Sequence, residues 1–307
     1  MKNSLKIAIL SYRSAPFGGG QGIYVYELSK VLKELGHQVD IISGPPYPEL
    51  IPGIELIKLP GLNLFSTFKF MDRLDLFLNK KNKSFDDWYE FGSTLLGGFP
   101  ELQTFGNRAH NYLLDKTYDV VIDNQSISYG AVKIQDSFPL VEIMHHPISK
   151  DYYYDLKFAK GILQSISKIR WYSFLKMQKS SAKKINVVVT PSMNSKEDIH
   201  IDFQVPMENI QVIPNGIDCD IFRPLPQILS KKNRLITTAS ADVPLKGLDF
   251  SLEAIARLKL EYPDIHLIII GSPRKEGHTE RLLKKLELEN HVSFRTNLTK
   301  EEITQEY

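Results

Sequence analysis

Short apolar runs alternate with amphipathic stretches along the first half of the chain. Residues 7–10 have the pattern of a buried strand, a glycine-rich segment follows at 16–22, and apolar residues then recur at helical spacing over 24–35. A second strand is predicted at 39–42, so this region forms a strand–helix–strand unit, from which parallel sheets are built. Further short, β-branched strands are predicted at 54–59, 118–123, 140–144 and 186–190.

The same alternation restarts after a proline-containing connector at 222–226. We therefore expect two α/β domains with parallel sheets, an N-terminal one over 1–213 and a C-terminal one over 214–307. Both faces of a parallel sheet have to be covered. A domain with only three strands and an unfinished helix is too small for this, so we expect the second domain to be incomplete. Its elements are predicted as strands at 235–239, 265–270 and 291–294, and helices at 248–258, 280–288 and from 300 onward.

Residues 62–116 interrupt the strand pattern of the first domain. This stretch is helical or irregular in pattern and contains basic and aromatic residues. We expect it to be an insertion that helps to shape a pocket for a second substrate, since such insertions in α/β domains often carry function. For any single residue in it, a solvated surface subdomain is the commoner case.

Composition narrows the class of protein. A chain of 307 residues with 42% hydrophobic and 24% charged residues is typical of a two-domain globular protein. The net charge of +2 is too small to indicate nucleic-acid binding. The single cysteine, Cys219, excludes an intrachain disulfide, and the sequence has no apolar run of about 20 residues that could span a bilayer. We expect a cytoplasmic protein that at most lies on a membrane.

Glycines after the first strand are candidates for phosphate binding. Gly19 and Gly20 precede the first helix, where backbone N–H groups and the helix dipole favour an anion. A tight turn that packs the helix on the strand explains the same glycines. The C-terminal domain offers a similar corner, because Lys246 and Gly247 precede its first helix and Gly271 follows its second strand. An ordinary surface lysine beside a glycine turn is the alternative there.

Two histidines follow the predicted strand at 140–144. His145 and His146 stand at its carboxyl end, where open α/β sheets bind ligands, and Pro147 ends the strand. A histidine there can bond a sugar hydroxyl or act near a leaving group. A metal site is less favoured, because no third ligand follows at a recognisable spacing. A purely structural, hydrogen-bonded role is the first choice for His146 and the second for His145.

Every charged residue from Lys157 to Lys184 is basic, and bulky apolar residues separate them. This pattern predicts an amphipathic helix. It fits either a helix at an anionic membrane surface or a solvated helix with one buried face, and the second is the commoner case. Membrane contact through this segment would favour a lipid-linked acceptor.

Taken in order, these segments resemble the family 4 glycosyltransferases, retaining enzymes of the GT-B fold. The resemblance spans nearly the whole chain, and the order of its motifs is specific. It rests on Gly18–Gly20 with the helix that ends at Leu35-Gly36-His37, on His145, on Val189-Thr190-Pro191-Ser192, on Ile213-Pro214-Asn215-Gly216-Ile217-Asp218 with Phe222 and Pro224, and on Pro244-Leu245-Lys246-Gly247.

The resemblance implies roles for particular residues. Gly19 and Gly20 would face the diphosphate of a nucleoside-diphosphate-sugar donor, with Gly20 the closer match, and His145 would contact the transferred sugar. Lys246 would neutralise the diphosphate leaving group, with Gly247 beside it. The implied enzyme needs no metal or other cofactor. Further donor-site candidates are Gly271, His146, Asn215, Asp218 and Ser240.

Two departures from the family pattern concern the donor site. The family usually has an arginine six residues before the lysine, and Ser240 stands at that position here. The family's two glutamates, seven residues apart, which hold the donor sugar and ribose, would follow after Tyr307. We therefore expect a truncated chain that is inactive as it stands.

Three classes of function remain. The leading one is a glycosyltransferase that moves a sugar to an unidentified glycan or lipid-linked acceptor, through an oxocarbenium-like transition state stabilised by Lys246 and His145. A sugar-nucleotide epimerase would instead need carboxylates for proton transfer, for which Asp123 and Glu142 are candidates. A non-catalytic nucleotide-binding protein is the third class.

Overall fold

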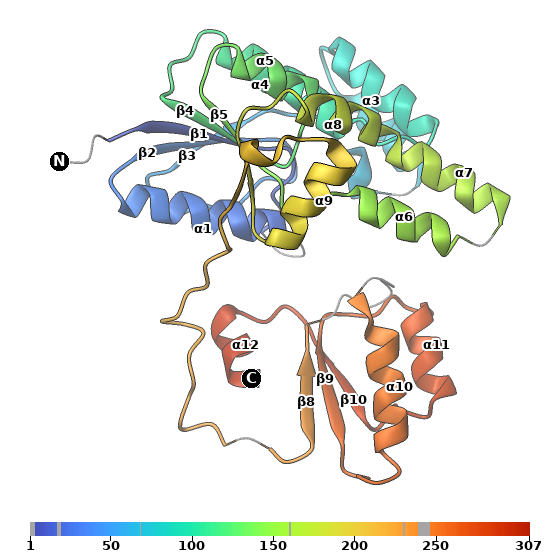
Figure 1. Cartoon of the computed structure of the whole chain (residues 1–307). Coiled ribbons are helices and arrows are strands. Elements are labelled where there is room, and N and C mark those ends of the chain that lie inside the picture. Colours follow the sequence, from blue (N-terminus) through green and yellow to red (C-terminus); the bar gives the residue numbers. More distant parts are fainter. Residues whose placement is uncertain (1–3, 17–19, 68, 160, 230, 239–245) are drawn as a thin grey trace. The chain divides into compact units, whose positions relative to one another are not determined.

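The chain divides into two compact units, Met1–Asn215 and Gly216–Tyr307, which we call the first and the second unit (Figure 1). The computed structural model describes residues 4–16, 20–67, 69–159, 161–229, 231–238 and 246–307. Sequence analysis predicts the boundary after residue 213. Each unit is an α/β structure with a parallel sheet, as the pattern of apolar runs predicts.

The first unit is built on a seven-stranded sheet in the order β3-β2-β1-β4-β5-β6-β7. Every pair of neighbouring strands is parallel. The order reverses between β1 and β4, which is the switch point where open α/β sheets bind ligands. The strands are β1 Lys6–Ser11, β2 Gln38–Ser43, β3 Glu55–Lys58, β4 Val120–Asn124, β5 Leu140–Ile143, β6 Val188–Thr190 and β7 Ile210–Val212.

Helices cover this sheet on both faces (Figure 1). The helices are α1 Gly20–Glu34, α2 Phe70–Asn79, α3 Phe85–Leu95, α4 Glu101–Leu113, α5 Tyr129–Gln135, α6 Ser149–Lys157, α7 Ile162–Trp171, α8 Leu175–Ala182 and α9 Met193–Phe203, with short 3-10 turns η1 Leu64–Ser66, η2 Tyr172–Phe174 and η3 Met207–Asn209.

Strand β1 shows how the two faces differ. Ile7 and Ile9 pack in one buried cluster with Val25 of α1, whereas Ala8 and Leu10 pack in another with apolar residues of α4 and α5. Because side chains alternate along a strand, a continuous apolar run buries both faces at once. This explains why the strands read as unbroken apolar runs in the sequence.

Helix α4 corrects the predicted extent of the insertion. The insertion was expected to run over about 62–116, but α4 packs on the central sheet through Phe105, Ala109 and Leu113. It also crosses α5 closely: a Cβ on Gly130 would lie 2.1 Å from the Gly106 carbonyl oxygen. The part of the insertion that stands apart from the sheet therefore comprises η1, α2 and α3.

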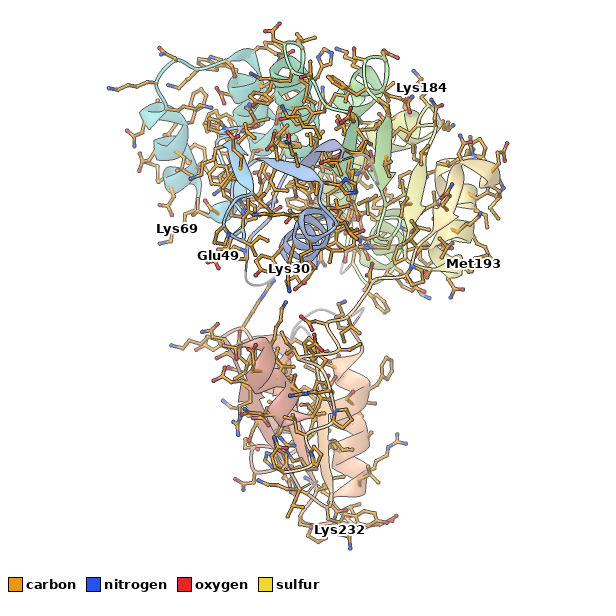
Figure 2. The ribbon with its side chains drawn as sticks, turned by 90° about the vertical axis from the view of Figure 1, so that its left-hand side faces the viewer. Lys30, Glu49, Lys69, Lys184, Met193 and Lys232 are labelled. Carbon is orange, nitrogen blue, oxygen red and sulfur yellow. The ribbon has the colours of Figure 1, made fainter. Side chains whose placement is uncertain are left out.

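The basic segment from Lys157 to Lys184 is not one helix, which corrects the prediction. It contains α7, the turn η2 and α8. Helix α8 buries Leu175, Met177 and Ala182, whereas α7 buries none of its residues. Lys184, just after α8, points outward in Figure 2. A short helical turn at Tyr172 thus separates a packed helix from an exposed one.

The second unit has a three-stranded parallel sheet in the order β10-β9-β8, from β8 Arg234–Thr237, β9 His266–Ile270 and β10 Val292–Arg295. Its helices are α10 Leu248–Leu258, α11 His278–Lys285 and α12 Lys300–Glu306. One apolar cluster joins α10 and α11 to the sheet, with Leu252 and Ile269 fully buried. Across the parts of the chain that the structure describes, no helix has the length and apolar character needed to span a bilayer.

Candidate functional site

His145 lies two residues beyond β5, at the carboxyl edge of the first sheet, and its neighbours hold it in place. Its ring Nε2 is 2.9 Å from the Asn124 side-chain oxygen, and its backbone N–H donates to the Gln125 side-chain oxygen at 3.0 Å. Asn124 is the last residue of β4. The Ser195 hydroxyl donates to the His145 carbonyl at 3.4 Å. Asn124 therefore holds the imidazole, while Gln125 and Ser195 hold the backbone of His145.

The His145 ring also contacts the first helix. The Tyr24 ring of α1 meets it edge to face, with ring centroids 4.5 Å apart and planes at 80°. Burial, together with the nearby His146, lowers the pKa of His145 to about 4. The imidazole is therefore neutral near pH 7, so it can accept and donate hydrogen bonds but carries no charge.

The loop that supplies Asn124 and Gln125 has an unusual backbone. Gln125 has φ of 64° and Ile127 has φ of 48°, in the left-handed region that a β-branched residue rarely adopts. Ser128 then caps α5 by accepting from the Ala131 N–H. Such conformations cluster where the surrounding structure holds a functional residue in place. A polar run directly after an apolar strand was the sequence signal for this loop, and sequence analysis did not use it.

Asp123 and Glu142 face each other on β4 and β5 and are both fully buried. Burial raises the pKa of Glu142 well above its ordinary value, and the adjoining Asp123 carboxylate raises it further. Ser126 donates to Asp123. Glu142 is therefore the carboxyl group of the pair that more readily holds a proton. Neither is accessible to a substrate, which removes the proton-transfer role that an epimerase would need.

His146 is the more exposed of the two histidines. Its Nε2 lies 3.1 Å from a carboxylate oxygen of Asp151 on α6, and its side chain is 54% exposed. Sequence analysis favoured a structural role for His146 over His145, whereas the structure gives the more extensive hydrogen bonding and burial to His145.

The corner between β1 and α1 depends on a glycine that sequence analysis did not single out. Gly20 begins α1, is exposed, and has open space around it, while Gly19 lies outside the described residues. A Cβ on Gly22 would lie 2.1 Å from the Ala15 carbonyl oxygen. Gly22 therefore allows α1 to start directly against the end of β1. The open N-terminus at Gly20 suits an anion.

In the second unit, candidate residues gather at the carboxyl edge of the sheet. Lys246 is exposed, and Gly247 caps α10 with φ of 67°. Gly271 directly follows β9. Its N–H donates to the Arg295 carbonyl at 2.8 Å, so this donor is already engaged within the sheet. Ser240 lies outside the described residues.

Two further basic residues lie at the same edge. Arg274 and Lys275 are exposed on the loop between β9 and α11. His278 at the start of α11 lies 2.8 Å from Asp249 at the start of α10, so the two helix N-termini are neighbours. This loop carries two cations at the same edge of the sheet as Lys246, and sequence analysis did not identify them.

Asn215 and Asp218 lie at the junction of the units and are exposed and half-buried, respectively. The Asp218 side chain accepts from the Asp220 N–H at 3.1 Å and from the Ile221 N–H at 3.4 Å. Asp218 therefore stabilises a local turn, and Asn215 has no described role.

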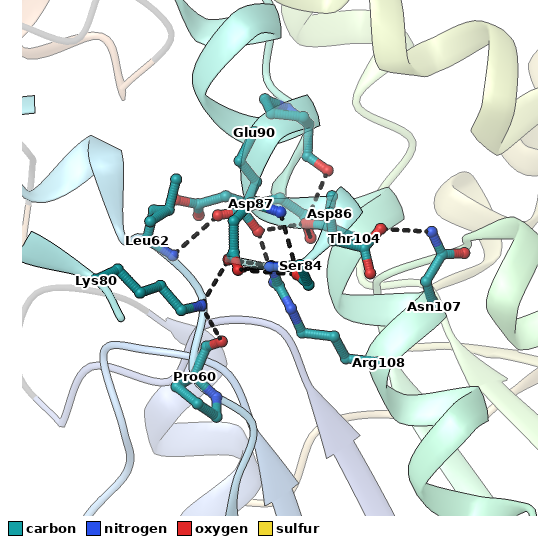
Figure 3. A network of polar contacts seen from close by, with 12 residues as sticks. Pro60, Leu62, Lys80, Ser84, Asp86, Asp87, Glu90, Thr104, Asn107 and Arg108 are labelled. Atoms are coloured by element: carbon teal, nitrogen blue, oxygen red, sulfur yellow. Dashed lines mark hydrogen bonds and ion pairs between the residues drawn. The ribbon is translucent and has the colours of Figure 1, made fainter. Parts of the chain in front are cut away.

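The insertion contains a separate polar network, between α2, α3 and α4 (Figure 3). Lys80 and Arg108 both bond the Asp87 carboxylate, at 2.6 and 3.0 Å, and Arg108 bonds Glu90 at 2.6 Å. The cavity beside this network, lined by Tyr12, Glu90 and Glu101 among others, has a volume of about 10 Å³, enough for one water molecule but not for a sugar.

Metal binding finds no support among the described residues, in which no group of three or more His, Cys, Asp or Glu side chains could hold an ion. The first unit therefore holds a neutral, half-buried histidine at the carboxyl edge of its sheet. The second unit, taken by itself, has an exposed lysine at the N-terminus of α10.

Known proteins match the chain along its whole length. Glycosyltransferase Family 4 matches residues 18–221, and Glycosyl transferases group 1 matches residues 225–307. The MMP α-(1→4)-mannosyltransferase of Mycolicibacterium hassiacum is 39% identical over 303 residues, which cover 97% of this chain and 72% of that protein.

Solved structures share the fold. HepE of Anabaena, in complex with UDP and glucose, is 17% identical with a TM-score of 0.62, covering 98% of this chain and 71% of its own. TarM, known from Staphylococcus aureus, is 13% identical with a TM-score of 0.62, covering 98% of this chain and 78% of its own. These likenesses confirm the expected GT-B fold.

Proposed function

Because this chain belongs to glycosyltransferase family 4, we propose that it binds a nucleoside-diphosphate sugar, with mannose as the sugar, for retaining transfer to a glycan acceptor. The sugar and the acceptor class follow the relative that is 39% identical, whose name describes α-(1→4)-mannosyl transfer. The structural observation that carries the proposal is the neutral His145, held at the carboxyl edge of the sheet by Asn124 and Gln125.

His145 acts on the transferred sugar in this proposal. A neutral imidazole can hydrogen-bond a sugar hydroxyl without placing a positive charge beside the oxocarbenium-like centre that develops in glycosyl transfer. Because Asn124 holds Nε2, the ring presents Nδ1 as its remaining polar atom. Tyr24 packs on the ring and limits its rotation.

Lys246 and the N-terminus of α10 act on the diphosphate. A lysine beside unpaired helix N–H groups stabilises the charge that grows on a departing nucleoside diphosphate. We assign the second cation, which the family usually supplies at the position of Ser240, to the loop that carries Arg274 and Lys275. Protein cations would thus perform the role that a metal has in other transferases, so we expect donor binding without added metal.

Calorimetric titration with GDP-mannose and UDP-glucose tests this function. Ligand binding is the readout, because it reports on the proposed donor site directly. We expect binding in the presence of EDTA, and about tenfold weaker binding for Lys246→Ala, equivalent to about 1.4 kcal/mol.

The matched control is Lys284→Ala. Lys284 is also exposed but lies in the last turn of α11, at the other end of that helix from the proposed phosphate site. If neither nucleotide sugar binds, or if both lysine variants weaken binding equally, the proposed donor site is wrong.

A further inference from the structure

Helices α6 and α7 form an antiparallel pair at one end of the first unit, and the loop that joins them lies at the outer end (Figure 1). Neither helix contains a buried residue. At the outer end, Phe158 is 60% exposed, Ile162 79% and Leu163 84%. Large apolar side chains that gather on an exposed helix pair indicate an interaction surface.

The apolar residues of α7 are arranged on one side of the helix. Ile162, Ile166 and Ile169 follow each other at spacings of four and three residues, and all three are exposed. Residues at these spacings share a face of an α-helix. Helix α7 therefore presents an apolar stripe to solvent. An amphipathic helix that packs on a domain core buries such a stripe.

The segment that carries this stripe has charges of one sign. Residues 157–184 contain eight basic residues and no acidic one. Lys168 is paired with Asp155 at 2.6 Å, but Arg170 and Lys176 are exposed. They line a groove of about 700 Å³ along α6, α7 and α8 together with Tyr153 and Tyr154.

We propose that the α6–α7 pair docks on an anionic lipid bilayer, with the stripe of Ile162, Ile166 and Ile169 entering the interface. Apolar side chains that reach the acyl boundary, flanked by cations that attract anionic headgroups, are the combination that interfacial helices use. Tyrosines beside the stripe suit the headgroup level, since each has an apolar ring and a polar tip.

A second copy of the chain fits this surface less well. In a two-fold dimer the same patch meets itself, so the basic residues of 157–184 would face like charges. A glycan also fits this surface less well, because polar sugar rings do not cover a stripe of isoleucine side chains. An anionic bilayer matches both the apolar and the basic part of the surface.

The insertion supplies a matched control surface. Helices α2 and α3 also expose large apolar residues, of which Phe85 is 83% exposed. Asp72 and Asp86 lie in the first turns of these helices, and Arg73, Lys81 and Lys83 lie near them in the sequence. This surface has the apolar part with charges of both signs, so we expect it to bind anionic lipid less well than the α6–α7 pair.

Vesicle co-sedimentation tests the proposal. Phosphatidylcholine vesicles with and without about 30% phosphatidylglycerol are mixed with wild type, with the double variant Ile162→Ser/Leu163→Ser, and with Arg170→Glu/Lys176→Glu. We expect wild type to bind only the anionic vesicles, and each double variant to bind at least about tenfold more weakly. Phe85→Ser should bind like wild type. Circular dichroism of each variant checks that the fold is kept.

Several results would overturn the proposal. Wild type that ignores phosphatidylglycerol content excludes an anionic bilayer as the partner. If Phe85→Ser loses as much vesicle binding as the double variants, the loss follows from removing any exposed apolar residue. Light scattering that shows a dimer in wild type and a monomer in Ile162→Ser/Leu163→Ser, without lipid, assigns the surface to a second copy. Each of these results leaves the proposed donor site untouched.

Discussion

The first unit buries carboxylates in two places, and it compensates them in opposite ways. In the insertion, Lys80 and Arg108 pair with Asp87 and Glu90 (Figure 3). At the sheet edge, no cation among the described residues bonds Asp123 or Glu142, and burial raises the pKa of both carboxyl groups instead.

The difference shows what each region requires. The insertion uses full charges, because its helices bring basic side chains to the carboxylates. The sheet edge lies next to Asn124 and His145, where a buried cation would alter the field around a neutral imidazole. Holding a proton on Glu142 reduces the buried charge at that edge without a cation.

The largest effect that we expect is on the insertion. Arg108→Ala leaves Asp87 and Glu90 buried with less compensation and should lower the free energy of unfolding by about 3–5 kcal/mol. Urea denaturation followed by circular dichroism measures it. Lys81→Ala, at an exposed neighbouring position, should change stability by less than about 0.5 kcal/mol. If the two variants are equally stable, the network does not stabilise the insertion.

The sheet edge should respond differently, because its carboxyl groups need a proton donor rather than a cation. Glu142→Gln keeps an N–H donor toward Asp123 and should cost less than about 1.5 kcal/mol, whereas Glu142→Ala removes the donor and leaves a cavity, at a cost of about 2–4 kcal/mol. The same denaturation experiment compares them. Equal losses for the two variants would contradict a protonated Glu142 that donates toward Asp123.

The pH dependence of stability should have opposite signs in the two regions. The pKa of Glu142 is raised in the folded state, so its contribution is complete below its unfolded pKa near 4.5 and is lost as the pH rises through the folded pKa. The pKa of Asp87 is lowered in the folded state despite burial, mainly by its bonds to Lys80 and Ser84. Its contribution is present above its unfolded pKa near 3.8 and is lost at lower pH.

Unfolding free energies from pH 3 to pH 8 test these signs. The advantage of wild type over Asp87→Asn should shrink toward acid, and that of wild type over Glu142→Gln should shrink toward alkali, by on the order of 1 kcal/mol each. Slopes of the same sign in both pairs would show that the two regions are not compensated in different ways.

The sequence predicted the architecture well where local pattern decides it. Apolar runs identified β1 to β6 and β8 to β10 to within a few residues, because buried parallel strands are apolar on both faces. The pattern missed β7, which has three residues, too few to show periodicity. It also assigned α4 to the insertion. Only the tertiary contacts of Phe105 and Gly106 show that this helix covers the sheet, and the sequence does not reveal them.

The candidate site was predicted in part. The position of His145 at a strand end follows from the order of strand and histidine in the sequence. Its partners do not: Tyr24 and Ser195 are far from it in sequence, and Asn124 meets it only because β4 and β5 are paired. The basic segment shows the same limit, since its composition gave no sign of the turn at Tyr172 that separates α7 from α8.

Calorimetric titration of wild type and His145→Ala with GDP and with GDP-mannose tests the central claim most directly, because the difference between the two ligands isolates the sugar. The account predicts that His145→Ala binds GDP as wild type does and loses affinity for GDP-mannose alone, by roughly 1–2 kcal/mol for a lost sugar hydrogen bond. Equal affinities of wild type and His145→Ala for GDP-mannose would contradict the account, because His145 would then not contact the donor sugar.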